Sequence, residues 1–292
     1  MSFSSEQKES IVNAVYKSVC CRSALLLGVL FAKGEVDGKR VTVALEKTEY
    51  CDLVARLVRE FYGKEAQTYR SDDGGRRLIL DFESKSAANY IYQIASDAEL
   101  CKQKCASCLS AFLRGVYLAA GRASDPASQY TLEFSLGVRS EIFSEFLSQI
   151  GPVSKISQRK SGMSVYMRDS SMIEYFYALA GMNKAMFTLI DARAEGELRR
   201  NVERISNCEM NNIQKAIDAA SPQVKLISAL EEANLLSSLP EELEQTARLR
   251  LAYPDYSLTQ LAQASVTSIS KPGLSHRLKK IMEIGEQLLN KR

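Results

Sequence analysis

The sequence predicts an α+β protein, in which a duplicated αββαββα unit is followed by an all-α region. Two segments carry the duplication, because Leu26–Gly34 and Leu113–Gly121 share Leu, Gly, Val, Ala and Gly at matching places. Their final glycines lie 87 residues apart, and a repeat of that length indicates one supersecondary unit used twice. Strand patterns cease at about Leu189, after which every periodic segment is helical.

The composition is that of an ordinary globular chain and limits the classes of function. The 292 residues are 46% hydrophobic and 25% charged, and the net charge of +3 gives no global basic field. The sequence shows no secretory signal and no apolar run of about eighteen residues, so we expect a cytoplasmic protein without a membrane span. Seven Cys suit reduced thiols, and the single His excludes His-rich zinc sites.

The first repeat, residues 1–95, is predicted from alternating periodicities. An amphipathic helix at the start has Ile11, Val12, Val15 and Val19 on one side. The turn Asp37-Gly38 predicts a hairpin, and Gly63 ends a helix with apolar residues at helical spacing. The expected order is helix Ser4–Val19, helix Arg22–Lys33, strands Glu35–Val36 and Arg40–Lys47, helix Thr48–Tyr62, strands Glu65–Arg70 and Arg76–Phe82, and helix Ser86–Ala95.

The second repeat, residues 96–188, follows the same order. Its expected elements are helix Ala106–Ala120, strands Arg122–Ser124 and Tyr130–Leu136, helix Arg139–Ile150, strands Val153–Gln158 and Ser164–Arg168, and helix Ser170–Ala180. The two Gly-bearing helices should pack together, because Gly28 and Gly115 allow a close backbone approach. Gly34 and Gly121 can end these helices in a left-handed conformation.

A polar linker helix is predicted over residues 189–221, with Ser221-Pro222 marking its end. Its Arg199, Arg200 and Arg204 are near enough to one another to contact a phosphate backbone. The last domain, residues 222–292, is predicted to contain helices Val224–Ala233, Pro240–Tyr253, Leu258–Ala264 and Lys271–Asn290.

The last two helices have the pattern of a helix-turn-helix. Ser257 and Ser270 are suited to cap them, and Pro272 lies in the first turn of the second helix. On that helix Leu274, Leu278, Ile281 and Leu288 form one face. The predicted DNA-binding residues are Ser270, Lys271, Ser275, His276, Arg277, Lys279 and Lys280, of which Ser275, His276 and Lys279 suit base edges and the cations suit phosphates. The alternative is a solvated basic helix end.

The whole chain resembles the WhiA family of bacterial transcription regulators linked to sporulation and cell division. The duplicated Gly-bearing helix resembles the LAGLIDADG homing-endonuclease motif. The stretches most specific to the family are Asn207–Asn212, Arg250–Pro254 and Ser270–Leu278. The resemblance implies a C-terminal domain that binds double-stranded DNA and an N-terminal, nuclease-derived domain without cleavage activity.

The residues support the absence of cleavage. The nucleases carry an acidic residue just before the final Gly of each motif, where the pair holds divalent metal. Here Lys33 and Ala120 stand at those positions, and neither binds Mg²⁺. We therefore expect no catalytic residue, no metal and no cofactor. A saddle of sheet or loop cations could still touch DNA, and it would comprise Lys39, Arg40, Arg70, Arg76, Arg77, Lys155, Arg159 and Lys160.

Two other classes of function are open from the sequence, an enzyme of either of two kinds and a protein-interaction module. Cys101-x3-Cys105-x2-Cys108 has the spacing of an iron–sulfur enzyme, although no strand of a βα-barrel precedes it. A nuclease would have to use Glu35, Asp37 or Asp125, which lie beyond the motifs. The third reading is a protein-interaction module, for example one that docks on RNA polymerase.

Overall fold

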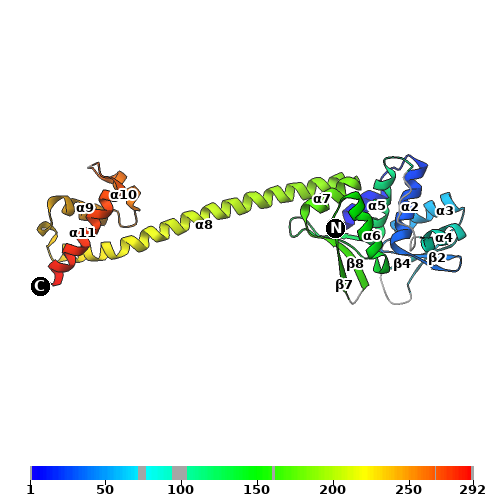
Figure 1. Cartoon of the computed structure of the whole chain (residues 1–292), viewed down its shortest axis with the longest axis horizontal. Helices are drawn as coiled ribbons and strands as arrows, with labels where there is room; N and C mark the ends of the chain where they lie inside the picture. Colours follow the sequence, from blue (N-terminus) through cyan, green and yellow to red (C-terminus); the bar gives the residue numbers. More distant parts are fainter. Residues whose placement is uncertain (1, 72–76, 94–103, 160–161, 267, 291–292) are drawn as a thin grey trace. The chain divides into compact units, whose positions relative to one another are not determined.

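The computed structural model describes residues 2–71, 77–93, 104–159, 162–266 and 268–290. They fall in two compact units, Met1–Glu197 and Leu198–Arg292 (Figure 1). The finer division predicted above, with boundaries after residues 95, 188 and 221, stays a prediction. Among the described residues no helix is long and apolar enough to cross a membrane.

The first unit contains the predicted duplication, and the α+β fold class is confirmed. Each repeat has one antiparallel four-stranded sheet, and the two strand orders correspond, β1-β2-β4-β3 and β5-β6-β8-β7. The first repeat consists of α1 (Phe3–Val12), α2 (Val19–Lys33), β1 (Gly34–Asp37), β2 (Arg40–Leu45), α3 (Thr48–Tyr62), β3 (Gln67–Arg70), β4 (Leu78–Glu83) and α4 (Lys85–Gln93).

The second repeat has the same sequence of elements. It consists of α5 (Cys108–Ala120), β5 (Gly121–Ala123), β6 (Leu132–Phe134), a short 3₁₀ helix η1 (Gly137–Arg139), α6 (Ser140–Ile150), β7 (Lys155–Arg159), β8 (Gly162–Met167) and α7 (Ser170–Leu179). Most predicted bounds agree to within two residues, which is the usual uncertainty of a helix or strand end. Residues 72–76, between β3 and β4, and residues 160 and 161, between β7 and β8, lie outside the described residues.

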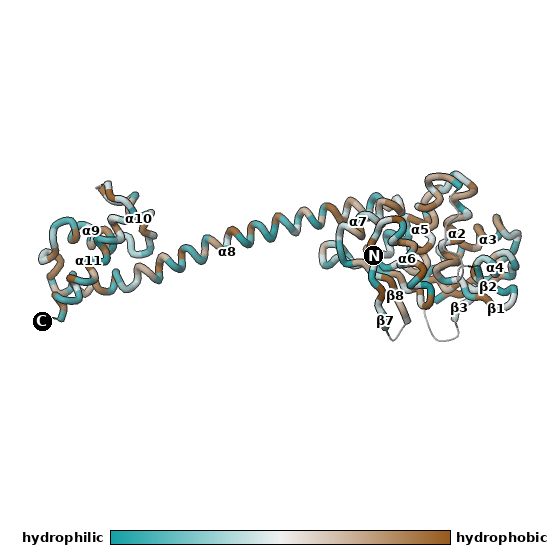
Figure 2. Tube along the Cα trace, in the orientation of Figure 1, coloured by the Kyte–Doolittle hydropathy of each residue, from teal (hydrophilic) through white to brown (hydrophobic). Residues whose placement is uncertain are grey.

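The helices α2 and α5 form the axis of the first unit and are hydrophobic along most of their length (Figure 2). A Cβ placed on Gly28 would lie 2.2 Å from the Phe112 carbonyl oxygen, and one on Gly115 would lie 2.1 Å from the Leu25 carbonyl oxygen. No side chain fits at that distance, so the two glycines allow the backbones to touch. The predicted close approach is confirmed.

The prediction of left-handed caps at the ends of these helices is wrong. Gly34 has φ −69° and ψ 123°, and Gly121 has φ −77° and ψ 144°, which is extended backbone. Each glycine leads directly into the first strand of its sheet. Space is the reason for glycine here, because a Cβ on Gly34 would lie 2.5 Å from the Leu30 carbonyl oxygen.

The first helix is shorter than predicted. α1 ends at Val12, and Val15 and Val19 are 84% and 59% exposed instead of lying on its apolar face. The apolar residues of the segment are therefore separated, with Ile11 and Val12 in α1, Val15 between the two helices and Val19 at the start of α2.

The second unit is all helical, as predicted. The helix α8 (Asn183–Glu232) leads into it and is followed by a 3₁₀ helix η2 (Leu236–Ser238), α9 (Glu241–Ala252), α10 (Leu258–Ala264) and α11 (Lys271–Asn290). The predicted break at Ser221-Pro222 is wrong, because Pro222 lies inside α8. A single missing N–H does not end a helix when the turns around it remain hydrogen-bonded. The core comprises Ile227, Leu230, Leu236, Leu239, Leu243, Ala247, Leu261, Leu274, Leu278 and Ile281.

Candidate nucleic-acid interface

The helices α10 and α11 have the caps that the sequence predicts. The Ser257 hydroxyl accepts a hydrogen bond from the Gln260 backbone N–H at 3.3 Å, and the Gln260 side chain accepts one from the Ser257 N–H at 3.0 Å. This reciprocal pair is a capping box. The Ser270 hydroxyl accepts from the Gly273 N–H at 3.3 Å and fixes the start of α11. Both helices of the motif therefore begin at defined residues.

One face of α11 is fully buried. Leu274, Leu278 and Ile281 are at most 1% exposed, and Leu261 of α10 is buried in the same cluster. Leu288, which was expected on this face, is partly buried against the cluster. Because this face is fixed in the core, the direction of the opposite face is also fixed.

The opposite face carries most of the predicted DNA-binding residues. Ser270, Lys271, His276, Lys279 and Lys280 are exposed, whereas Ser275 is half-buried. Ser270 is the cap before α11 and the others lie in the first three turns of the helix, toward the end whose dipole favours an anion. The assignment of single residues to bases or phosphates stays a prediction.

Arg277 differs from the other cations of the set. Its guanidinium donates to Glu242 of α9 at 2.8 Å, and the Arg277 side chain is only 24% exposed. The residue also lines a pocket of about 300 Å³ with Gln245, Thr246, Leu249, Ser265 and Val266. In this structure Arg277 joins α11 to α9, so a phosphate would have to compete with Glu242 for it.

Arg250 is a residue of this unit whose role the sequence did not indicate. It is 1% exposed, and its guanidinium donates to the carbonyl oxygens of Tyr256 at 2.7 Å and Tyr253 at 3.4 Å. Burial lowers the pKa of the guanidinium below its ordinary value. These bonds hold the loop between α9 and α10, and thereby position the first helix of the motif. In the sequence, the run Arg250–Pro254 indicates only the resemblance to the family.

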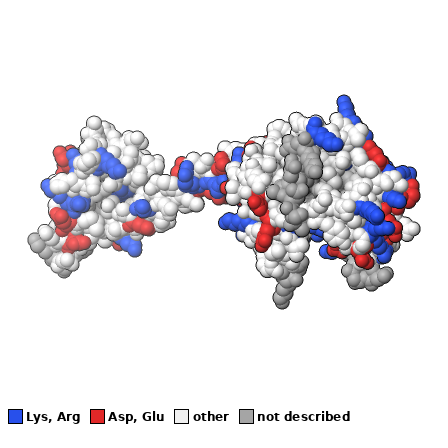
Figure 3. Space-filling view, turned by 45° about the vertical axis from the view of Figure 1, so that its right-hand side comes forward, with Lys and Arg blue, Asp and Glu red and all other residues white. Residues whose placement is uncertain are grey.

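The three linker arginines lie on α8. Arg199, Arg200 and Arg204 are all exposed, as are the residues on either side of them. On the face shown in Figure 3, basic and acidic side chains are interspersed instead of gathering into one basic patch. The surface thus gives no separate support for a phosphate contact at these arginines, and their role stays a prediction.

Lys33, which stands where the resemblance implies a metal-binding acid, has cations in its electrostatic surroundings. Lys33 is half-buried and donates to the Ser135 carbonyl oxygen at 2.7 Å. Desolvation lowers the pKa of Lys33, and Arg77, Arg139 and Lys8 lower it further, while Glu35 opposes them. Burial also lowers the pKa of Arg139, which donates to the Phe31 carbonyl oxygen at 2.9 Å.

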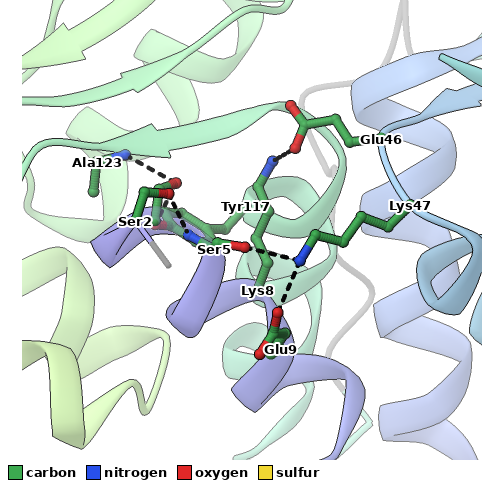
Figure 4. A network of polar contacts seen from close by, with 9 residues as sticks. Ser2, Ser5, Lys8, Glu9, Glu46, Lys47, Tyr117 and Ala123 are labelled. Atoms are coloured by element: carbon green, nitrogen blue, oxygen red, sulfur yellow. Dashed lines mark hydrogen bonds and ion pairs between the residues drawn. The ribbon is translucent and has the colours of Figure 1, made fainter. Parts of the chain in front are cut away.

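The helix α1 has a network of polar contacts with residues far away in the sequence (Figure 4). The buried Lys8 donates to Glu46 at 2.9 Å, and Lys47 donates to Glu9 at 2.8 Å and to Ser5 at 2.9 Å. Charged groups are seldom buried without partners, so this pairing fixes α1 in place. Among the described residues the groups of three or more possible ligands include no carboxylate cluster here.

The predicted saddle cations divide into several cases. Arg40 is paired with Asp81, and that hydrogen bond raises the pKa of the guanidinium. Lys39, Arg70, Arg77 and Lys155 are exposed. Arg76 and Lys160 lie outside the described residues, and Arg159 is described only as part of β7. The saddle therefore stays a prediction for the exposed members.

Two cysteines of the predicted iron–sulfur spacing belong to a group of four among the described residues. Cys105 and Cys108 lie beside Cys20 and Cys21, and the four sulfur atoms are within 4.8 Å of one another. Cys101 lies outside the described residues. Hydrogen bonds from Cys21 and the Ser107 backbone lower the pKa of Cys105 to about 7, whereas burial raises that of Cys21 to about 12.

Comparison with known proteins agrees with this architecture. The family model described as the WhiA LAGLIDADG-like domain matches residues 109–199, and the one described as the WhiA C-terminal HTH domain matches residues 202–285. The chain is 30% identical to the "Probable cell division protein WhiA" of Bacillus subtilis over 311 residues, covering 99% of this chain and 97% of that protein. It is 34% identical to the protein of the same name from Geobacillus sp., covering 99% and 96%.

A solved structure shows the same fold over nearly the whole length. The crystal structure of full-length DUF199/WhiA from Thermatoga maritima has a TM-score of 0.62 and 22% sequence identity, and the match covers 98% of this chain and 99% of that one. The resemblance inferred from the Gly-bearing helices and the C-terminal motif is confirmed, and the chain belongs to the WhiA family.

Proposed function

We propose that the chain is a sequence-specific DNA-binding transcription regulator in which α11 enters the major groove. The observation that carries the proposal is the division of α11 into two faces, one fully buried and one polar and exposed at the start of the helix. The second helix of a helix-turn-helix meets base edges with its N-terminal residues. A capped α10 just before it is the remaining part of such a motif.

The roles within this face follow from reach and chemistry. Ser275, His276 and Lys279 carry donors and acceptors that match base edges in the major groove. Ser270 and Lys271 lie at the helix N-terminus, where phosphate is favoured, and Lys280 and Arg277 flank the face. Arg277 reaches a phosphate only by leaving Glu242, which makes its contribution smaller than its charge suggests.

The proposal is tested by selecting binding sequences from random DNA with the full chain and then measuring affinities at several salt concentrations. Affinity should fall steeply with salt, because phosphate contacts release counterions. Lys279→Ala should cost about 1–3 kcal/mol and relax the preference at one position. Lys271→Ala should weaken all sequences alike and reduce the salt slope by about one.

The matched control is Lys215→Ala, which removes the same charge from an exposed position on α8. It should leave affinity and preference unchanged. Equal losses in Lys279→Ala and Lys215→Ala would contradict the assignment of α11. A protein that selects no sequence above background would favour the interaction-module alternative, in which RNA polymerase or another regulator is the partner.

Arg250 supplies a positioning test of the same proposal. Arg250→Met keeps much of the apolar stem but removes the bonds to Tyr253 and Tyr256. Because α10 would lose its fixed loop, we expect weaker binding with an unchanged sequence preference. A purely structural role would change only the unfolding midpoint, so affinity at a temperature where both proteins are folded separates the two.

The relatives' names supply the biological setting that we propose. Since they are named probable cell division proteins, we propose that the genes under control are those of cell division or sporulation, and that the protein works at the nucleoid in the bacterial cytoplasm. Mapping bound DNA across the genome tests this directly. Binding sites scattered without relation to such genes would contradict it.

We further propose that the first unit does not cut DNA. The supporting observation is that Lys33 and Ala120 stand where the resemblance implies paired acids, and that Arg77, Arg139 and Lys8 lower the pKa of Lys33 while Glu35 opposes them. Supercoiled plasmid incubated with the chain and Mg²⁺ should remain supercoiled. Nicking that disappears in Glu35→Ala would instead establish the nuclease alternative.

A further inference from the structure

Four cysteines from two distant segments meet at the start of the α2–α5 pair. Cys20 and Cys21 lie in the first turn of α2, Cys105 lies just before α5, and Cys108 is its first residue. The Cys105 sulfur is 3.6 Å from that of Cys20, 3.5 Å from that of Cys21 and 3.6 Å from that of Cys108. Every one of the four sulfur atoms lies within 4.8 Å of the others.

We propose that these four cysteines form a structural site for one tetrahedrally coordinated zinc ion that joins the two repeats. Zinc bound by four thiolates at about 2.3 Å places the sulfur atoms about 3.8 Å apart at the corners of a tetrahedron. The three shortest sulfur separations are close to that edge, so the side chains need only small adjustments to meet one ion.

The same distances argue against the other chemistries of a cysteine group. A disulfide requires sulfur atoms about 2.05 Å apart, and all four cysteines are free. In a [4Fe–4S] cluster each cysteine binds a different iron, and in a [2Fe–2S] cluster the four cysteines are divided between two irons. Ligand sulfurs on different irons lie farther apart than the edge around a single ion. A compact four-sulfur set is instead typical of mononuclear zinc.

The surroundings suit a negatively charged metal site. Zinc with four thiolates carries a net negative charge, and the first turns of α2 and α5 both direct the positive end of a helix dipole at it. Cys21 and Cys108 are buried and Cys20 and Cys105 are partly exposed, so the site is shielded but not closed. A pocket of about 390 Å³ that includes Cys21 and Ser107 among its lining residues provides a route for the ion.

The position of the site gives it a structural role. Cys20 and Cys21 belong to the first repeat and Cys105 and Cys108 to the second, and these pairs are 84 or more residues apart. A metal bond between them would close that long loop and hold α2 against α5 at the end opposite to Gly34 and Gly121. Because no position remains for water or substrate, the site is structural and not catalytic.

The test uses the full chain purified with reductant, supplied with Zn²⁺ and freed of loose metal on a desalting column. Elemental analysis should find one zinc per chain, and Co²⁺ in its place should give intense thiolate-to-metal charge-transfer absorption. The double variant Cys105→Ser with Cys108→Ser should lose both signals. Cys208→Ser, which removes an exposed thiol on α8, should keep both.

A measurement on the unmodified chain guards against misfolding of the double variant. Zinc should slow alkylation of Cys20 and Cys105 by about tenfold or more, since a bound thiolate is a poor nucleophile, and leave Cys208 unchanged. Four results would each overturn the proposal. They are retention of less than a tenth of an equivalent of zinc, alkylation of Cys20 and Cys105 at a rate that zinc does not change, iron with sulfide in the isolated protein, and a native disulfide within the group.

Discussion

The two ends of the α2–α5 pair have opposite chemistry. At the end of the pair, beside Gly34 and Gly121, Lys33 donates to the Ser135 carbonyl oxygen, and Arg77, Arg139 and Lys8 lower the pKa of Lys33 while Glu35 opposes them. At the start, four thiols meet within 4.8 Å. The nucleases of this fold place their metal ligands at the first of these ends, whereas the four thiols of this chain lie at the second.

The packing of this helix pair is therefore independent of the groups that could bind a metal at either end. Gly28 and Gly115 bring the backbones together in the middle, and that contact does not depend on which groups lie at either end. Lys33 and Ala120 stand where the resemblance implies acids, and the glycine contact is present with these residues in place. A stabilising contact can then be supplied at the opposite end.

The largest expected effect comes from separating α2 from α5, the helix pair that forms the axis of the first unit. Gly28→Ala places a Cβ 2.2 Å from the Phe112 carbonyl oxygen, so the two helices must move apart. We expect a loss of about 3 kcal/mol or more in the free energy of unfolding, because overpacked backbone contacts cannot relax. Guanidinium denaturation, monitored at both units, provides the measurement.

Gly273→Ala is the matched control, since the nearest atom to its added Cβ is an Ile269 side-chain carbon at 3.3 Å. There the same substitution lies in a helix and should change stability by at most about 1 kcal/mol. If Gly28→Ala were as mild as Gly273→Ala, the close approach would not be what holds the axis.

The second effect concerns the thiol end and rests on the zinc proposal. Removing zinc with a chelator should lower the free energy of unfolding by about 2.7 kcal/mol when the free ion had been at one hundred times its Kd. A calorimetric or denaturant titration with and without chelator measures it. The variant Cys105→Ser with Cys108→Ser should not respond to chelator, and an equal response there would place the metal elsewhere.

The third effect concerns the cationic end. Arg139 lies at the end of η1, and its guanidinium donates to the Phe31 and Gly34 carbonyl oxygens at the end of α2. Arg139→Met should cost about 2 kcal/mol, because these hydrogen bonds come from a charged and mostly buried group. Arg122→Met, at an exposed position on β5, is the control, and urea denaturation should show little change for it.

The elements of the fold could be predicted because their causes are local. The helix α3 has the bounds Thr48–Tyr62 that its apolar spacing and Gly63 predict, and Gly63 has φ +60°. The capping box at Ser257 follows from two residues three apart. The division of α11 into a buried and an exposed face follows from the 3.6-residue period alone.

The candidate sites were only partly predictable because their causes are not local. Spacing links Cys101, Cys105 and Cys108, whereas the fold brings Cys105 and Cys108 to Cys20 and Cys21, more than eighty residues away in the chain. The cationic region at Lys33 likewise depends on Arg139 and on α1. Buried Arg250 looks like any other arginine in the sequence, because the carbonyl groups that bind it come from a loop.

The smallest effect is a pH dependence at Lys33, whose pKa burial and neighbouring cations hold below the ordinary 10.5. Between the folded pKa and 10.5 the unfolded chain holds the proton that the folded chain has lost, so the free energy of unfolding rises with pH across that window. Lys33→Met removes this rise. The free energy of unfolding of the Lys33→Met variant, minus that of the unmodified chain, should therefore be greatest near neutral pH and should decline as pH approaches 10.5. Denaturant midpoints of the two proteins over that range measure the difference, and a difference independent of pH would show that the Lys33 ammonium is as well solvated in the folded chain as in the unfolded one.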